Sequence, residues 1–316
     1  MLYRAQQREL FKKAICEIIS QMDKLFVQRN TSNYFLHRDI INSLFKPSTQ
    51  LDAEAQIILR LTIIDSLYST NAAYSYFSID EMAQKIISLG NDEAASLYFY
   101  GIATGKNTGK ILFDERYGIR KNLEHGSRQM SLLSKYAYYL LLQNKEKYLL
   151  GFPIYDSLAL DQFPKVYDRL GIELNKKLKY RDNIDDYIKA LDVLRKELFS
   201  DGGEYHFQHF DLLDAYLWQM GKFDVGNISL LNTRQEYTQI IENLELRPSQ
   251  TISNEEETEE QKQQKEEKFA DQVVAKFKSM SVDDILKNID NCDESFKSFL
   301  EHWKKIQDIE AGKVIA

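Results

Sequence analysis

The chain has 316 residues, of which 43% are hydrophobic and 12% aromatic, so it can bury a substantial core. It holds only 13 glycines and 4 prolines, which disfavours a fold of many short strands joined by tight turns. Cys16 and Cys292 form no CxxC pattern, which excludes a disulfide framework and a cysteine-rich metal site. The net charge of −7 argues against a generally basic nucleic-acid-binding protein.

Apolar residues recur at helical spacing along most of the chain, and no segment shows the sustained alternation of a strand. We therefore predict an all-α fold, a multi-helix globule with a helical C-terminal tail. Ser78 and Glu81 form a capping-box pattern at the start of one helix, and Gly90 is placed to end it. The predicted helices cover about 4–28, 33–46, 51–69, 78–89, 92–103, 128–144, 156–170, 183–199, 207–221 and 232–246.

The domain organisation is predicted from a change in composition after Pro248. Residues 1–248 read as a helical core, and residues 253–268 hold seven Glu and no apolar residue. The segment 249–268 is therefore an acidic linker, as an exposed helix or a disordered stretch, and 269–316 regains a helical pattern.

The sequence offers no segment suited to a membrane. The N-terminal residues carry charges throughout, unlike a signal peptide. The longest apolar run, Tyr136–Leu142, is far shorter than the ~20 residues that a membrane span needs. We expect a soluble, cytoplasmic protein without membrane contact.

A basic segment stands out within the acidic chain. Residues 105–149 hold nine Lys or Arg and four Asp or Glu, and much of this segment (105–127) reads as a long loop with four of the thirteen glycines. Such a basic segment can contact phosphate, although a solvated loop explains it equally well. The candidate nucleic-acid contacts are Lys106, Lys110, Arg120, Lys121 and Arg128.

A metal site receives little support. His206 and His209 lie three residues apart near Asp211 and Asp214, which is a possible metal corner. Polar residues at the start of a helix explain this stretch better, so we predict no metal and no cofactor.

Lys135 and Asp156 are the residues to which a chemical mechanism can be attached. Lys135 lies in a helix that is apolar around nearly its whole circumference, so its ammonium either reaches the surface or sits in a partly dry site. A dry site lowers the pKa of a lysine and frees the amine that Schiff-base chemistry requires. Asp156 follows Pro153 and opens the next helix, where an aspartate is expected as an N-cap.

The order and spacing of this lysine and aspartate resemble the helix-hairpin-helix DNA glycosylase superfamily, in particular divergent 8-oxoguanine DNA glycosylases. The resemblance rests on 125–163, with a looser fit of helix order over about 50–246. It implies that Lys135 attacks the sugar C1′ to form a Schiff base and that Asp156 assists. In the family a Gly-x-Gly run before the lysine holds a DNA phosphate, whereas this chain has Ser131 and Leu133 there.

The resemblance predicts a DNA glycosylase or abasic-site lyase, with DNA as its partner. Tyr136, Tyr139 and Tyr155 are candidates to line a pocket for a flipped base. One alternative is a non-catalytic helical protein that keeps this fold and binds a protein partner through 249–316. Another is a nucleic-acid-binding module that uses the 105–128 loop without chemistry. The position of Lys135 relative to Asp156 distinguishes an enzyme from these alternatives.

Overall fold

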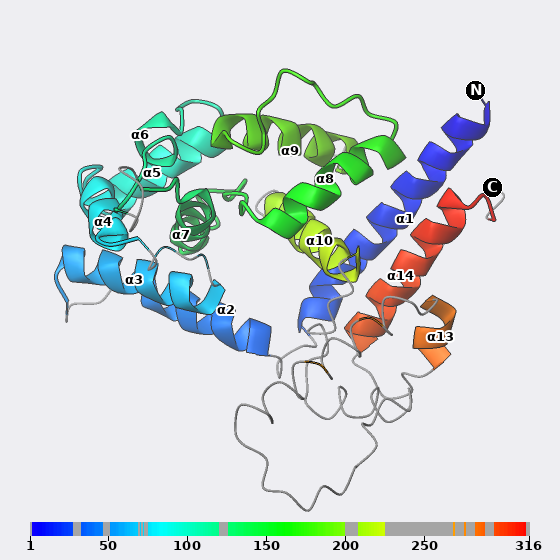
Figure 1. The fold of residues 1–316 in the computed structure, drawn as a ribbon, viewed down its shortest axis with the longest axis horizontal. Coiled ribbons are helices and arrows are strands. Elements are labelled where there is room, and N and C mark those ends of the chain that lie inside the picture. Colours follow the sequence, from blue (N-terminus) through cyan, green and yellow to red (C-terminus); the bar gives the residue numbers. More distant parts are fainter. Residues whose placement is uncertain are drawn as a thin grey trace, which may run out of the picture. The chain divides into compact units, whose positions relative to one another are not determined.

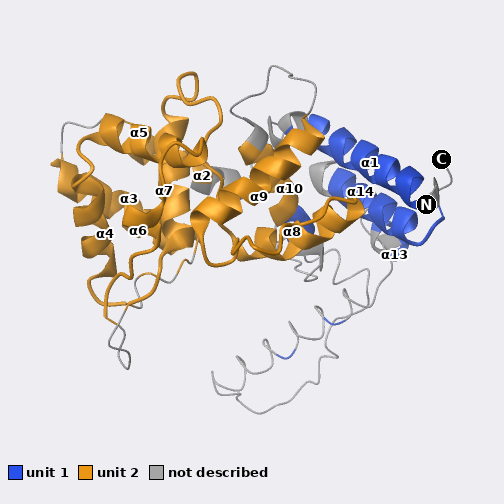
Figure 2. Ribbon diagram, turned by 90° about the horizontal axis from the view of Figure 1, so that it is seen from above, with its two compact units in different colours: residues 1–32, 219–316 blue, residues 33–218 orange. Residues whose placement is uncertain are grey.

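A computed structural model gives the fold, and its contacts divide the chain into two units, 33–218 and 1–32 with 219–316 (Figure 2). The all-α prediction is confirmed, since the described part of the chain consists of helices, loops and two isolated β-bridges (Figure 1). The residues that the structure describes are 2–27, 33–46, 51–68, 70, 72, 75–119, 126–199, 208–224, 268, 275, 282–287 and 294–313.

The larger unit, 33–218, contains the residues with candidate chemistry. Its helices agree in order with those predicted, and the predicted helix at 232–246 lies outside the described residues. The helices are α2 (Asn33–Leu44), α3 (Ala53–Tyr68), α4 (Ser78–Ile87), α5 (Asp92–Ala103), α6 (Lys110–Phe113), α7 (Met130–Leu142), α8 (Ser157–Arg169), α9 (Ile184–Leu198) and the first part of α10 (Gln208–Asp224).

Helix α7 is the centre of this unit and packs against α2, α3, α5 and α6. Every residue from Leu132 to Leu141 is buried, because leucines, tyrosines and alanine cover the whole circumference of the helix. The prediction of a helix buried on most sides is confirmed. Lys135 is therefore surrounded by packed side chains and has no direct route along the helix surface to water.

The predicted capping box at α4 is wrong. The N-cap of α4 is Phe77, which has a left-handed φ of 63° and makes no side-chain capping bond. Ser78 instead donates to the carbonyl of Ala72 at 2.7 Å, and Glu81 accepts a bond from the amide of Gly118 at 2.6 Å. Both side chains are used to hold neighbouring loops, so neither is available to cap the helix.

The described residues of the glycine-rich segment, 105–119 and 126–127, have defined structure where a long loop was predicted. They include the short helix α6, and two antiparallel bridges join Tyr76 to Ile119 and Tyr117 to Ser127. Only glycine fits at 126, because a Cβ there would lie 1.9 Å from the carbonyl oxygen of Tyr117.

The smaller unit is formed by segments from both ends of the chain. Its helices are α1 (Leu2–Val27), α13 (Val282–Lys287) and α14 (Glu294–Glu310). Gln7 donates to the carbonyl of Ile309 at 3.1 Å and Lys305 pairs with Glu17, so α1 and α14 run antiparallel (Figure 1). This unit therefore combines the first predicted helix with the C-terminal segment 269–316.

The predicted acidic linker falls almost wholly outside the described residues. Across the described helices of both units, none has the length and hydropathy that a bilayer crossing requires.

Candidate active site

Lys135 occupies a dry position on α7. Its side chain is 3% exposed, and its ammonium nitrogen Nζ donates to the hydroxyl of Ser131, one turn earlier on the same helix, at 2.7 Å. Nζ also lies 5.2 Å from the centre of the Tyr68 ring, a position that allows a cation–π contact. Of the two environments considered for this lysine, the structure shows the dry one.

Asp156 is the N-cap of α8, as predicted. Its backbone is extended, and its Oδ1 accepts a hydrogen bond from the amide of Leu158 at 2.9 Å. Its other oxygen, Oδ2, lies 3.9 Å from Nζ of Lys135, and the Asp156 side chain is 24% exposed. The capping role and the pairing with lysine are therefore compatible, because each uses a different oxygen.

Two hydrogen bonds hold the segment before Asp156 in place. The amide of Tyr155 donates to the hydroxyl of Ser134 on α7 at 2.9 Å. The hydroxyl of Tyr187, on α9, donates to the carbonyl of Ile154 at 2.9 Å. Asp156 thus reaches Lys135 because its own segment is fixed to α7 on one side and to α9 on the other.

Asp214, on α10, is a further member of this site that the sequence did not assign to it. Its side chain is buried, and Oδ1 has no hydrogen-bond partner among the described residues. It interacts electrostatically with both Lys135 and Asp156. The sequence holds one signal for this role: Asp214 is a lone aspartate in the apolar run "LLDAYLWQM". Lys135 stands out in its own apolar helix in the same way.

Burial changes the protonation of this cluster. Removal from water lowers the pKa of Lys135 below its usual value, and the nearby Asp156 and Asp214 carboxylates oppose this effect without overcoming it. Burial likewise raises the pKa of Asp214 well above its usual value; the negative charge of Asp156 adds to this rise, whereas Lys135 opposes it. Burial therefore shifts both Lys135 and Asp214 toward their uncharged forms.

The structure describes only part of the possible metal corner near α10, and the described part makes other contacts. Asp211 forms an ion pair with Arg38 at 3.1 Å, and Arg38 also bonds the hydroxyl of Tyr138. His206 and the side chain of His209 lie outside the described residues. No group of side chains suited to hold a metal ion occurs in the part of the chain that the structure describes.

The three tyrosines considered for a base pocket take different positions. Tyr136 and Tyr139 are completely buried, and the hydroxyl of Tyr139 shares a 2.6 Å hydrogen bond with that of Tyr68. Tyr155 is half-buried, and its ring contacts the Tyr187 ring edge-on at 5.3 Å. In this structure the first two are packing residues, and only Tyr155 reaches the surface.

The candidate DNA contacts are exposed where the structure describes them. Lys106 and Lys110 carry exposed side chains near α6. Arg128 is exposed as well and donates to the carbonyl of Asp182 at 2.8 Å. Arg120 and Lys121 lie outside the described residues.

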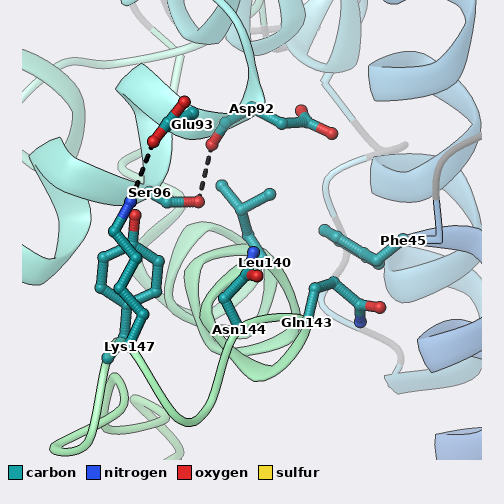
Figure 3. A pocket seen from close by; sticks show the side chains of 9 residues that line it. Phe45, Asp92, Glu93, Ser96, Leu140, Gln143, Asn144 and Lys147 are labelled. Atoms are coloured by element: carbon teal, nitrogen blue, oxygen red, sulfur yellow. Dashed lines mark hydrogen bonds and ion pairs between the residues drawn. The ribbon is translucent and has the colours of Figure 1, made fainter.

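A surface cavity of about 440 Å³ lies elsewhere in this unit (Figure 3). Leu140, which lines it, is about 140° around α7 from Lys135, on the basis of 3.6 residues per turn. The charged side chains that line the cavity are paired: Lys147 with Glu93 at 2.9 Å, and Asp92 with Arg60 at 3.0 Å. The cavity is therefore separate from the Lys135–Asp156 pair. It is lined by Phe45, Asp92, Glu93, Ser96, Leu140, Gln143, Asn144, Lys147 and Tyr148.

No protein-family model, no curated protein and no solved structure matches this chain. Functional inference therefore depends on the geometry of the site.

Proposed function

We propose that this protein is a DNA glycosylase or abasic-site lyase that uses Lys135 as a Schiff-base nucleophile. The observation that supports the proposal most strongly is the dry lysine with a lowered pKa whose Nζ lies 3.9 Å from a carboxylate oxygen of Asp156. A lysine amine can attack a carbon only when it has lost its proton, and burial favours the loss of that proton.

The reaction at an abasic site would proceed through the open-chain aldehyde of the deoxyribose. The lone pair of Nζ adds to C1′ to give a carbinolamine, which then loses water to form the imine that links Lys135 to the DNA. Asp156 is placed to accept a proton during the addition and to stabilise the positive charge of the protonated imine. Because its Oδ1 is fixed by the Leu158 amide, Oδ2 remains available for this role.

The proposed partner is DNA, contacted through exposed cations that include Lys106, Lys110 and Arg128. The overall charge of −7 predicts weak binding that falls steeply with salt. A flipped base would have to enter beside Lys135, and Tyr155 is the tyrosine best exposed to contact it.

Borohydride trapping tests this proposal. The protein is incubated with a duplex that contains one abasic site, and sodium borohydride reduces any imine to a stable protein–DNA adduct. We expect an adduct with the native protein, none with Lys135→Met, and an unchanged yield with Lys147→Met, a matched control at an exposed lysine.

Absence of an adduct from the native protein, where a known lyase gives one under the same conditions, would contradict the proposal. Salt-dependent DNA binding without an adduct, unaffected by Lys135→Met, would instead favour a binding module without chemistry. A partner captured through 249–316, with no DNA activity at all, would favour the non-catalytic alternative.

A further inference from the structure

The Lys135 site contains two carboxylates in very different surroundings. Asp156 is 24% exposed, and its Oδ1 accepts a hydrogen bond from the amide of Leu158. Asp214 is buried, and its Oδ1 has no hydrogen-bond partner in the described part of the chain. A buried carboxylate oxygen without a partner is costly as an anion, so this carboxyl group favours the neutral form.

Tyr68 and Tyr187, which interact electrostatically with Asp214, do not compete for a proton. The hydroxyl of Tyr187 already donates to the carbonyl of Ile154, and that of Tyr68 shares its hydrogen bond with Tyr139. Burial raises the pKa of both Tyr68 and Tyr187 well above the usual value, so both stay protonated. A proton that leaves Lys135 therefore goes to a carboxylate.

We propose that Asp214 holds the proton released by Lys135, so that the lysine is present as a free amine beside Asp156. The step is a redistribution within the cluster: the ammonium of Lys135 loses one proton and the carboxylate of Asp214 gains one, which yields an amine and a neutral carboxyl group. No charge is created or lost, and no other reactant is needed. Asp214 acts through Lys135: it does not react itself, but it positions the proton away from the lysine amine.

This transfer changes which groups carry charge inside the unit. In the form with an ammonium, Lys135 and Asp214 both carry a charge inside the unit; after transfer, neither does. Removing a charge from water is costly, so burial favours the second form. The charged and titratable groups around Asp214, from all the elements with which it interacts, are Lys135, Asp156, Tyr187, Tyr68, Arg38 and Asp211.

The use of the amine in a reaction rests on the proposed function, but the position of the proton can be measured without DNA. The native protein is labelled with ¹³C at the carboxyl carbons of aspartate, and carbon NMR spectra are recorded at neutral pH. We expect one aspartate signal at the position of a protonated carboxyl group. It should disappear in Asp214→Asn and remain in the matched variant Asp156→Asn.

Asp214→Glu provides a second variant if Asp214→Asn does not fold. Glutamate retains a carboxyl group but is not labelled, so the protonated aspartate signal should again disappear. Ionisation of every aspartate at neutral pH in the native protein would overturn the proposal. A protonated signal that persists in Asp214→Asn or Asp214→Glu would overturn it as well.

The pH profile of adduct formation gives a second readout that a purely structural role would not change. With Asp214 present, one proton is shared within the pair across neutral pH, so the rate should vary little with pH. In Asp214→Asn the proton must leave to solvent, and the rate should rise about tenfold per pH unit below the pKa of Lys135. Asp214→Glu should restore the flat profile.

The two readouts separate this inference from the proposed function. If the native protein forms no adduct, the proposed function fails, and the NMR spectrum still decides where the proton resides. If adducts form but the profiles of the native protein and Asp214→Asn have the same shape, the proton-holding role of Asp214 fails while the lyase proposal stands.

Discussion

Two buried basic side chains in the larger unit, Arg60 on α3 and Lys135 on α7, are held in very different ways. Nη1 of Arg60 lies 3.0 Å from both carboxylate oxygens of Asp92, and its Nε donates to the carbonyl of Leu44 at 3.1 Å. Lys135 has a longer ion pair, 3.9 Å, and among the described residues its ammonium donates to a neutral hydroxyl, that of Ser131.

This difference distinguishes a buried cation that stabilises the fold, Arg60, from a buried amine that can react, Lys135. A buried charge is tolerated when short, charge-assisted hydrogen bonds replace much of the lost water, as those of Nε and Nη1 do at Arg60, whose Nη2 has no hydrogen-bond partner among the described residues. At Lys135 that replacement is incomplete, so the cheaper solution is to lose the charge, which an arginine cannot do. A buried lysine with a poorly compensated charge is therefore a candidate for reactivity.

The largest effect on stability should come from Arg60→Ala. This change removes a guanidinium that lies 4.7 Å from the Phe45 ring and leaves the Leu44 carbonyl without its partner. We expect a loss of about 3–5 kcal/mol in the free energy of unfolding, measured with urea. Asp92→Asn should cost less because Asp92 is half exposed, and a loss below about 1 kcal/mol for Arg60→Ala would contradict the structural role.

The next effect concerns the pH dependence of stability at Asp214. The folded state raises the pKa of this acid, so between the unfolded and folded pKa values the folded protein binds more protons, and stability falls as pH rises. Asp214→Asn removes this penalty. Relative to the native protein, the variant should gain up to about 1.4 kcal/mol per pH unit as the pH rises from 4 toward 7.

Urea unfolding of both proteins across this pH range measures the difference directly. An equal pH dependence for the native protein and Asp214→Asn would show that the carboxyl group of Asp214 is not strongly perturbed.

At Lys135, replacement by methionine should cost less stability than replacement by arginine, although arginine is the more conservative change in charge. Lys135→Met keeps the approximate volume and removes a charge, so we expect the free energy of unfolding to change by no more than about 1 kcal/mol. Lys135→Arg introduces a group that stays charged and should be the more destabilising of the two. If Lys135→Arg proves the milder change, the site compensates a cation better than its geometry indicates.

The smallest effect should come from the cap of α8. Asparagine is as good an N-cap as aspartate, so Asp156→Asn should change stability by only a few tenths of a kcal/mol, whereas Asp156→Ala should cost about 1 kcal/mol. Adduct formation should fall in both variants because both remove the carboxylate beside Lys135. Full activity in Asp156→Asn would limit Asp156 to its capping role.

The sequence was sufficient where the signal is local. Helical periodicity located α7 and placed Lys135 in a buried segment, and the residue type before α8 identified Asp156 as a cap. These signals act over one or two turns of helix. The pairing of Lys135 with Asp156 was implied by the resemblance to the glycosylase superfamily, and the structure places Nζ of Lys135 3.9 Å from Oδ2 of Asp156.

The rest depended on tertiary contacts that no short pattern encodes. Asp214 joins the site through the packing of α10, far along the chain from Lys135. Because α7 is apolar on all sides, its sequence did not show which tyrosines face a pocket, and Tyr136 and Tyr139 lie in the core. Ser78 and Glu81 have the residue types of a capping box, but nearby loops use both side chains.

The most direct measurement is the location of the covalent bond on the protein. The borohydride-reduced adduct with abasic-site DNA is digested, and mass spectrometry identifies the modified lysine. The account predicts that the sugar remnant is attached to Lys135 and that Lys147, the exposed control, is unmodified. Attachment at any other amine, with Lys135 unmodified, would contradict it.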